Sequence, residues 1–295
     1  MAEQKIQFRK IRDFGENLGD TFLFIKSNLR SLLISVLTIC AVFMLAQAIF
    51  NQINQSRAFG IFDQFRRGFN NDPYRSFNYV FTPEYVLAIL CTWFSHIALQ
   101  VTLAAYIKTY VIGESVAPSV EQIWDVFRRY YLRVLLYSIP IFLLVAIGFI
   151  FCIAPGVFLA VVLMPFTMVV VVEESNFGIA FNRCFQLVKD NFWISIAIYI
   201  VAAMIYYFCT FAVGAAIGVL VLIMTYLTAR SLATAMGILT SILNVFSGIL
   251  YIIFFVSVSF QYFSLVEKKD ATGILQRIDQ IGSSGDNVDN AEKQY

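Results

Sequence analysis

His96 is the only histidine among the 295 residues, and it lies within an apolar stretch. An ionisable side chain in such a place is a functional candidate by default, although a neutral imidazole also serves as a hydrogen-bonding group between membrane helices. A single histidine excludes a zinc site built from several histidines, and Val101 stands where an His-x4-Asp acyltransferase pattern requires aspartate. His96 is therefore a candidate intramembrane polar site, for which a hydrogen bond between helices is the simpler interpretation.

Glu173 and Glu174 are adjacent carboxylates, and such a pair could share a proton or bind a cation. They end a long apolar run, so we expect them at the membrane edge, where water solvates them and Arg128 or Arg183 can pair with them. A structural role is the favoured interpretation. Glu173 nevertheless joins His96 as a candidate polar site.

No other arrangement of residues in the sequence is typical of catalysis. The five cysteines stand singly, without a C-x-x-C pair, which argues against both a disulfide framework and a metal site. Phosphate-binding loops and dinucleotide fingerprints are also missing from the sequence. We therefore expect a protein that is not an enzyme, with no catalytic residue, no metal, no cofactor and no nucleic-acid partner.

The elements that carry these residues are long and apolar. Hydrophobic residues make up 59% of the chain and charged residues 14%, against about 25% charged residues in an average globular protein. A helix needs roughly 20 apolar residues to cross the hydrocarbon core, and Pro155-Gly156 marks a turn that divides the longest run into two such helices. The predicted spans are residues 31–50, 85–107, 134–152, 156–172, 193–221 and 237–263. The sequence thus predicts an all-α, polytopic integral membrane protein with about six transmembrane helices in three hairpins.

The distribution of Lys and Arg predicts the orientation, because these residues accumulate on the cytoplasmic side of a membrane protein. If the N-terminus is cytoplasmic, that side receives sixteen of the 21 Lys and Arg residues. We therefore expect both termini in the cytoplasm. The expected regions are a cytoplasmic amphipathic segment (1–30), a six-span transmembrane domain (31–266) with an external loop (51–84), and a cytoplasmic short helix with a disordered tail (267–295).

A short, amphipathic and basic segment precedes each hairpin, at residues 21–28, 124–131 and 184–191. We predict an interfacial helix at each, with its apolar face at the acyl boundary and its cations reaching the anionic headgroups. Flanks of membrane helices are commonly amphipathic and basic, so whether the hairpins are true repeats stays open. The residues expected to contact lipid or a partner are Arg128, Arg129, Arg133, Arg183 and Lys189.

Four further segments predict local features of the helices and of the connections between them. Gly214 and Gly218 match the G-x-x-x-G pattern of close helix packing. Residues 226–235 either form an interfacial turn or belong to helices that project beyond the bilayer, and residues 270–281 predict a short cytoplasmic helix. Aromatic residues at helical spacing predict a helix on the outer interface within the external loop: Phe59, Phe62, Phe65 and Phe69.

One region resembles a known family. Pro155-Gly156 is followed by Met164-Pro165-Phe166, by Val172-Glu173-Glu174 and by a segment of the form R-x-x-x-L-x-K-x-x-x-W from Arg183 to Trp193. This order resembles the membrane domain fused to some bacterial glycerophosphodiester phosphodiesterases, and its stand-alone relatives, with Cys184 in place of a serine. The resemblance implies a protein of the bacterial cytoplasmic membrane without catalysis of its own, because the activity of the fused relatives belongs to a separate soluble domain.

Three functions remain after this elimination. The leading hypothesis is a non-enzymatic scaffold or accessory protein whose interfacial helices bind the anionic headgroups of membrane lipids or contact another membrane protein. The alternative is a small-molecule transporter or channel with a path near His96, Pro140, Pro165 and Glu173. A membrane-embedded enzyme comes third, because it would require His96 to meet the carboxylate of Glu173 or Glu174.

Overall fold

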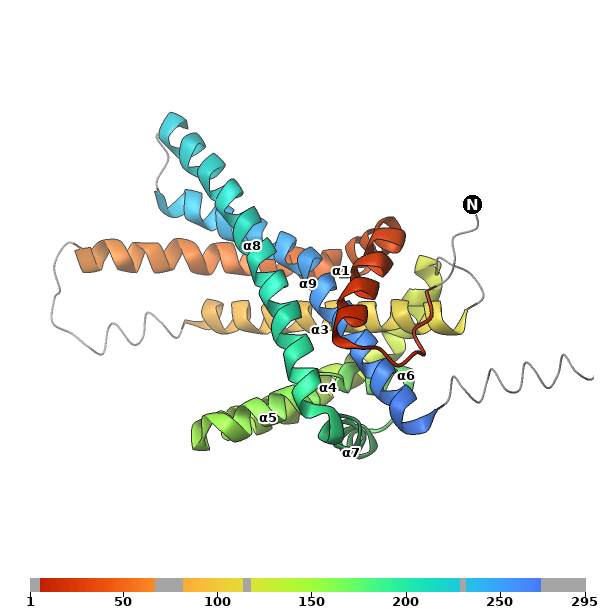
Figure 1. Cartoon of the computed structure of the whole chain (residues 1–295). Coiled ribbons are helices and arrows are strands. Elements are labelled where there is room, and N and C mark those ends of the chain that lie inside the picture. The colour runs from red at the N-terminus through yellow and green to blue at the C-terminus, as the bar shows by residue number, and fades with distance from the viewer. Residues whose placement is uncertain (1–5, 67–81, 114–117, 229–231, 272–295) are drawn as a thin grey trace, which may run out of the picture.

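The computed structural model describes residues 6–66, 82–113, 118–228 and 232–271 (Figure 1), and within these ranges all regular structure is helical. Six helical segments are long and apolar enough to cross a membrane. The predicted fold class, an all-α polytopic membrane protein with six spans, is therefore confirmed. The six segments are Phe14–Asn54, Pro83–Ile112, Val120–Phe151, Ile153–Val172, Phe177–Met224 and Leu239–Asp270.

Helix α1 (Phe14–Arg66) contains the first span and extends past both of its predicted ends. The predicted interfacial helix at residues 21–28 is the N-terminal part of α1. Figure 1 shows these first turns, in dark red, running in a different direction from the long orange remainder. At its other end α1 covers the positions of Phe59, Phe62 and Phe65, whereas Phe69 lies outside the described residues.

Helix α3 (Pro83–Ile112) lies at the centre of the bundle. Thr82 caps its start, since the hydroxyl oxygen accepts a hydrogen bond from the backbone N–H of Tyr85 at 3.3 Å. Pro83 occupies the first turn, where its missing N–H would have no partner within the helix. Side chains from Ile97 to Tyr110 are almost all buried, because α3 packs against α1, α4, α6 and α9.

Helix α4 (Val120–Phe151) begins with a capping box. The backbone N–H of Gln122 donates to the Ser119 hydroxyl at 3.3 Å, and the backbone N–H of Ser119 donates to the Gln122 side chain at 3.2 Å. The predicted interfacial segment 124–131 forms the first turns of this helix and continues into the third span without a break. Pro140 lies inside the helix.

The turn of the second hairpin lies at Cys152, whose backbone is extended, and the prediction that Pro155-Gly156 forms it is wrong. Pro155 instead sits in the first turn of α5 (Ile153–Leu163), a position that suits its fixed φ. Gly156 allows α4 and α5 to approach, because a Cβ atom there would lie only 2.8 Å from the backbone nitrogen of Phe149. The hairpin is tight, as predicted, and its turn comes a few residues earlier.

A Pro residue also separates α5 from α6 (Phe166–Val172), since Pro165 is the N-cap of the second helix. The amphipathic segment before the last hairpin forms a separate helix, unlike the other two. After it, the chain continues through a short 3-10 turn into two long helices. These elements are α7 (Phe177–Val188), η1 (Lys189–Asn191), α8 (Phe192–Thr228) and α9 (Leu232–Asp270).

The last hairpin packs through small residues. Cβ atoms built on Gly214 and Gly218 of α8 would lie 3.1 Å from Leu243 and 3.8 Å from Leu239 of α9, which confirms the predicted helix contact. Residues 226–228 and 232–235 are helical, whereas residues 229–231, where the alternative turn around Arg230 would lie, fall outside the described part of the chain. Beyond α9, the predicted helix at residues 270–281 falls largely outside the described part of the chain.

The aromatic core lies where α1 begins and where α3 and α9 end. Phe8, from the segment before α1, stacks on Phe260 at 4.4 Å between ring centroids and packs edge-on against Phe24 and Tyr110. Arg12 is only 3% exposed, donates to Asp20 at 2.8 Å and lies 4.5 Å from the Phe260 ring centroid. The N-terminal segment is therefore part of the core, and Arg12 does not point toward lipid headgroups.

Candidate functional site

Charged side chains gather where α3 and α9 end and α4 begins, as ion pairs that join these helix ends to the segment after α6 and to α7 show. The link between α6 and α7, residues 173–176, lies at the same end and contributes Glu173 and Glu174. Glu174 has a φ of 54°, in the left-handed region, so its side chain and that of Glu173 leave the backbone in different directions. As a result the two neighbouring carboxylates enter two separate groups of side chains.

The first group, the locked network, consists of Glu173, Arg183, Tyr262 and Asp270. Arg183 Nε donates to both carboxylate oxygens of Glu173 at 3.2 Å, and the other guanidinium nitrogens donate to Asp270. The Tyr262 hydroxyl donates to Glu173 at 2.9 Å. The Arg183 side chain is only 18% exposed at the contact between α6, α7 and α9. The carboxylates of Glu173 and Asp270 both pair with its positive charge there.

The second group, the cationic cluster, surrounds the buried ring of Tyr130. Lys108 Nζ lies 4.8 Å from the ring centroid, and the guanidinium carbons of Arg129 and Arg133 each lie 5.6 Å from it. Glu174 is the carboxylate of this group, at 2.7 Å from Lys108 Nζ and 3.8 Å from Arg129. Among the described residues, three cations thus surround the Tyr130 ring and one carboxylate, Glu174, pairs with two of them.

Lys108 and Arg129, on the two sides of the cationic cluster, differ in their exposure. Lys108 is 8% exposed and also donates to the backbone carbonyl of Val171 at 2.8 Å, so it is fixed between α3 and α6. Arg129 has a side chain that is 65% exposed. The hydrogen bond from Lys108 to the carboxylate is the main cause that lowers the pKa of Glu174 below its ordinary value, so Glu174 is ionised at neutral pH.

The remaining predicted contact residues lie apart from both groups. Arg128 is 68% exposed and pairs with Asp125 one turn earlier on α4 at 3.1 Å. Lys189 is exposed in η1, close along the chain to Trp193, which is 80% exposed. Of the five predicted residues, the structure therefore brings together Arg129 and Arg133, and it places Arg183 in the locked network.

Sequence reasoning did not assign Lys108, Tyr130 or Asp270 to a site. Lys108 carried the clearest signal, because it is the one Lys, Arg, Asp or Glu between Tyr85 and Ile112 in the sequence. A lysine at the end of a span, with no neighbouring charge on its own helix, requires a partner from another helix. Glu174 is that partner, and it is 66 residues away in sequence.

His96 does not meet the carboxylates. Its side chain is exposed on the surface of the chain, and its ring lies edge-on to Tyr251 at 6.1 Å between centroids. A crevice of about 20 Å³, enough for one water molecule, separates it from Gln47 and Asn244. Lys108, which contacts Glu174, lies twelve residues further along α3, or about 18 Å at 1.5 Å per residue.

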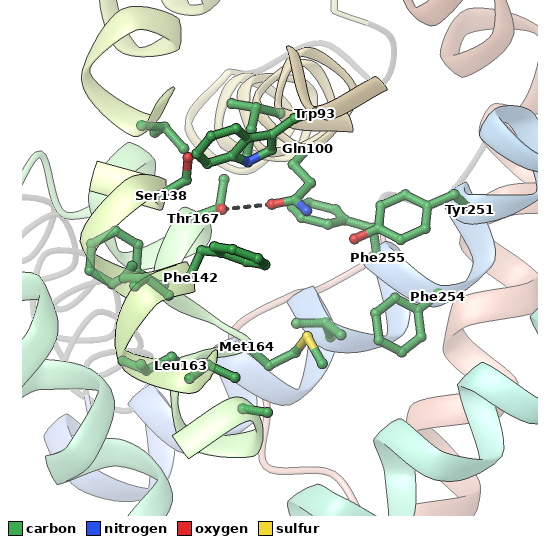
Figure 2. A pocket seen from close by; sticks show the side chains of 17 residues that line it. Trp93, Gln100, Ser138, Phe142, Leu163, Met164, Thr167, Tyr251, Phe254 and Phe255 are labelled. Carbon is green, nitrogen blue, oxygen red and sulfur yellow. Dashed lines mark hydrogen bonds between the residues drawn. The ribbon is translucent and has the colours of Figure 1, made fainter. Parts of the chain in front are cut away.

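A larger cavity of about 280 Å³ lies between α3, α4, α9 and the α5–α6 segment (Figure 2). Thr167 donates to the side-chain oxygen of Gln100 at 3.0 Å on one wall, and aromatic and aliphatic side chains form most of the others. The cavity is next to Pro140 and Pro165, since Ser138 and Met164 line it, whereas His96 is not among its lining residues. The predicted transport path through His96 and both prolines is thus divided between two separate spaces.

Comparison with models of protein families, with curated proteins and with solved structures gave no match to this chain. Within the described residues, no group of three His, Cys, Asp or Glu side chains is placed to hold a metal ion. The sequence and structure together identify a polytopic, multi-helix membrane protein with a charged end and an uncharged interior cavity.

Proposed function

We propose that this chain is a non-enzymatic membrane protein that binds anionic phospholipid headgroups at the cationic cluster, as a scaffold or accessory protein of the bacterial cytoplasmic membrane. The observation that carries the proposal is the charge imbalance around Tyr130, where Lys108, Arg129 and Arg133 gather and, within the described residues, Glu174 is the carboxylate paired with them. A guanidinium group donates two parallel hydrogen bonds to phosphate oxygens, so exposed Arg129 suits a phosphate ligand.

The position of the cluster supports a lipid as the source of that phosphate. Arg129 and Arg133 lie one turn apart at the start of the third span, and Lys108 lies near the end of the second. Trp124, on the same part of α4, is 46% exposed, and tryptophan favours the level of the headgroups. A phosphate bound at the cluster would therefore lie at the depth of a phospholipid headgroup.

The sequence supports the cytoplasmic placement of the cluster and the assignment to a bacterial, non-enzymatic protein. The Lys and Arg distribution favours cytoplasmic termini, and the cytoplasmic leaflet is the one that carries negative surface potential. The resemblance of residues 153–193 to a membrane domain of bacterial phosphodiesterases favours a bacterial protein without catalysis of its own. Another membrane protein remains the competing partner for the same basic surface.

The test compares two double variants that remove the same charge. Arg129→Gln with Arg133→Gln removes two cations of the cluster, whereas Lys26→Gln with Arg30→Gln removes two exposed cations of α1. Binding of phosphatidylglycerol and phosphatidylcholine to each purified variant is measured by native mass spectrometry in detergent.

Each cation near the membrane surface contributes about 1 kcal/mol to anionic lipid binding, so the cluster variant should bind phosphatidylglycerol roughly thirty-fold more weakly. The α1 variant should lose clearly less. Equal losses in both variants would indicate general attraction without a specific site, and an unchanged affinity in the cluster variant would contradict the proposal.

A further inference from the structure

We propose that the interior cavity beside Gln100, together with a second cavity beyond Trp93 and Phe142, binds one long hydrocarbon chain that carries an uncharged, hydrogen-donating polar group. A long-chain alcohol or a monoacylglycerol has this chemistry. The proposal concerns a site inside the bundle and does not depend on the cationic cluster.

The polar end of the site is formed by three hydroxyl groups and one amide. Figure 2 shows Gln100, Ser138, Thr167 and the hydroxyl of Tyr251 around the inner part of the cavity. Thr167 donates its proton to Gln100 at 3.0 Å, and Ser138 donates its proton to the backbone carbonyl of Leu135 at 2.7 Å. The oxygens of Thr167 and Ser138 can still accept hydrogen bonds, so they suit a ligand that donates one, such as an alcohol.

A second cavity of about 450 Å³ continues the site toward the start of α3. Trp93 and Phe142 line both cavities, and their rings lie 6.1 Å apart. Phe142 is 65% exposed, so the aromatic pair lies at the outer surface of the bundle, where lipid would surround it. Movement of either ring would join the two spaces into one groove that opens sideways to the bilayer.

The length of the joined groove fits a single chain. Gln100 lines the inner cavity and Tyr85 lines the outer one, and a separation of fifteen positions along α3 spans about 22 Å. Half of a hydrocarbon core of about 30 Å is about 15 Å, so the groove is long enough for the chain of one leaflet. Asn51 and Asn54 line the outer end of the second cavity.

The uncharged lining of the two cavities selects against ionic ligands. Every residue that lines either cavity is uncharged, and most are apolar or aromatic. Burial of a fatty acid carboxylate or an ammonium group there would leave its charge without a partner. The site should therefore prefer an alcohol to a charged amphiphile of the same chain length.

Trp93 supplies the reporter for a test, because it lines both cavities and the chain has only three tryptophans. With Trp124 and Trp193 changed to Phe, the fluorescence of Trp93 alone is titrated with 11-bromoundecan-1-ol, whose bromine quenches nearby tryptophan. The charged comparison is (11-bromoundecyl)trimethylammonium. The control protein keeps only Trp193, which is 80% exposed and lines neither cavity.

We expect saturable quenching of Trp93 by the alcohol, at a concentration at least ten-fold lower than for the ammonium compound, and unsaturated quenching of Trp193 by both. Ala160→Phe, which fills the inner cavity, should abolish saturation, and Thr167→Val should weaken alcohol binding about five-fold through the lost hydrogen bond. Thr167→Val keeps the volume of the side chain, so it tests the site even if Ala160→Phe does not fold. Linear quenching of equal slope at Trp93 and Trp193, or saturation that neither variant alters, would overturn the proposal.

Discussion

The locked network and the cationic cluster use the same kinds of residue at the same end of the bundle, with opposite charge balance. In the locked network, Arg183 faces two carboxylates, those of Glu173 and Asp270. In the cationic cluster, one carboxylate faces three cations, two of which are on the accessible side of α4. A basic residue at a membrane edge is therefore not by itself a lipid contact, because the carboxylates around it decide whether its charge is available.

The comparison also separates stability from binding. A guanidinium group whose hydrogen bonds are all made inside the protein stabilises the fold and has little left to offer a ligand. An exposed guanidinium beside an aromatic ring contributes little to stability and can bind phosphate. Substitutions in the locked network should therefore lower stability with little effect on lipid binding, whereas substitutions of the exposed arginines of the cationic cluster should weaken lipid binding with little effect on stability.

The largest effect should come from Arg183→Gln. The substitution leaves Glu173 and Asp270 close together without their cation, inside the contact between α6, α7 and α9. Breaking a fully buried pair costs about 3–5 kcal/mol, and partial exposure here reduces the expected loss of stability to about 2 kcal/mol. Thermal unfolding in detergent measures the loss, and phosphatidylglycerol binding should stay within about two-fold of the unsubstituted protein.

Arg183→Lys is the matched control for that variant. It keeps the charge and removes the fork that reaches both carboxylates, so it should lose roughly half as much stability. If Arg183→Gln instead weakened lipid binding as strongly as the cluster variant does, the division into two groups would be wrong.

Lys108→Met should have the next largest effect, because Lys108 takes part in both properties. Its ammonium group donates to Val171 and Glu174 while nearly buried, and loss of hydrogen bonds made by a charged group costs about 1.5 kcal/mol. We expect a loss of stability near that value together with weaker lipid binding. A melting temperature that did not change would mean that the contacts of Lys108 between α3 and α6 contribute no net stability.

Tyr262→Phe removes one hydrogen bond from the locked network and nothing from the cluster. The hydroxyl donates to Glu173 at 2.9 Å, and Arg183 remains to neutralise the carboxylate. The expected loss is about 1 kcal/mol, again without an effect on lipid binding. Its control is Tyr130→Phe, which removes a hydroxyl from the cluster and should change lipid binding more than Tyr262→Phe does.

The sequence predicted the elements of this fold well because each rests on local chemistry. Apolar segments of about 20 residues identify spans, and the Ser119–Gln122 capping box identifies the start of α4 from four consecutive residues. The prediction placed the turn at Pro155 instead of Cys152, because proline is common both in turns and in the first turn of a helix. Only the packing of Gly156 against Phe149 distinguishes the two.

The composition of the two charged groups could not be predicted in the same way. Arg129, Arg133 and Arg183 look alike in sequence, each being a cation on an amphipathic segment at a membrane edge. Their difference arises from contacts that span 87 residues, between Arg183 and Asp270, and from the left-handed backbone at Glu174. No local pattern encodes either feature.

Glu174→Gln gives the smallest effect and the sharpest test of the charge imbalance. It removes the one carboxylate of the cluster, so the three cations should bind phosphatidylglycerol more tightly at neutral pH, by at most about five-fold for one charge near the surface. The carboxylate side chain is 48% exposed, so the change in stability should be small.

The pH dependence follows from the same residue. The pKa of Glu174 is lowered from 4.5, chiefly by its hydrogen bond from Lys108, so its stabilising ion pair is fully present above about pH 4.5 and is lost as the pH falls through the folded-state value. Protonation also removes the negative charge from the cluster. The ratio of lipid affinity between Glu174→Gln and the unsubstituted protein, measured by native mass spectrometry from pH 7 to pH 3, should therefore fall toward one at acidic pH. Because the lipid titrates identically in both samples, a constant ratio over that range would show that Glu174 does not limit the charge available to the headgroup.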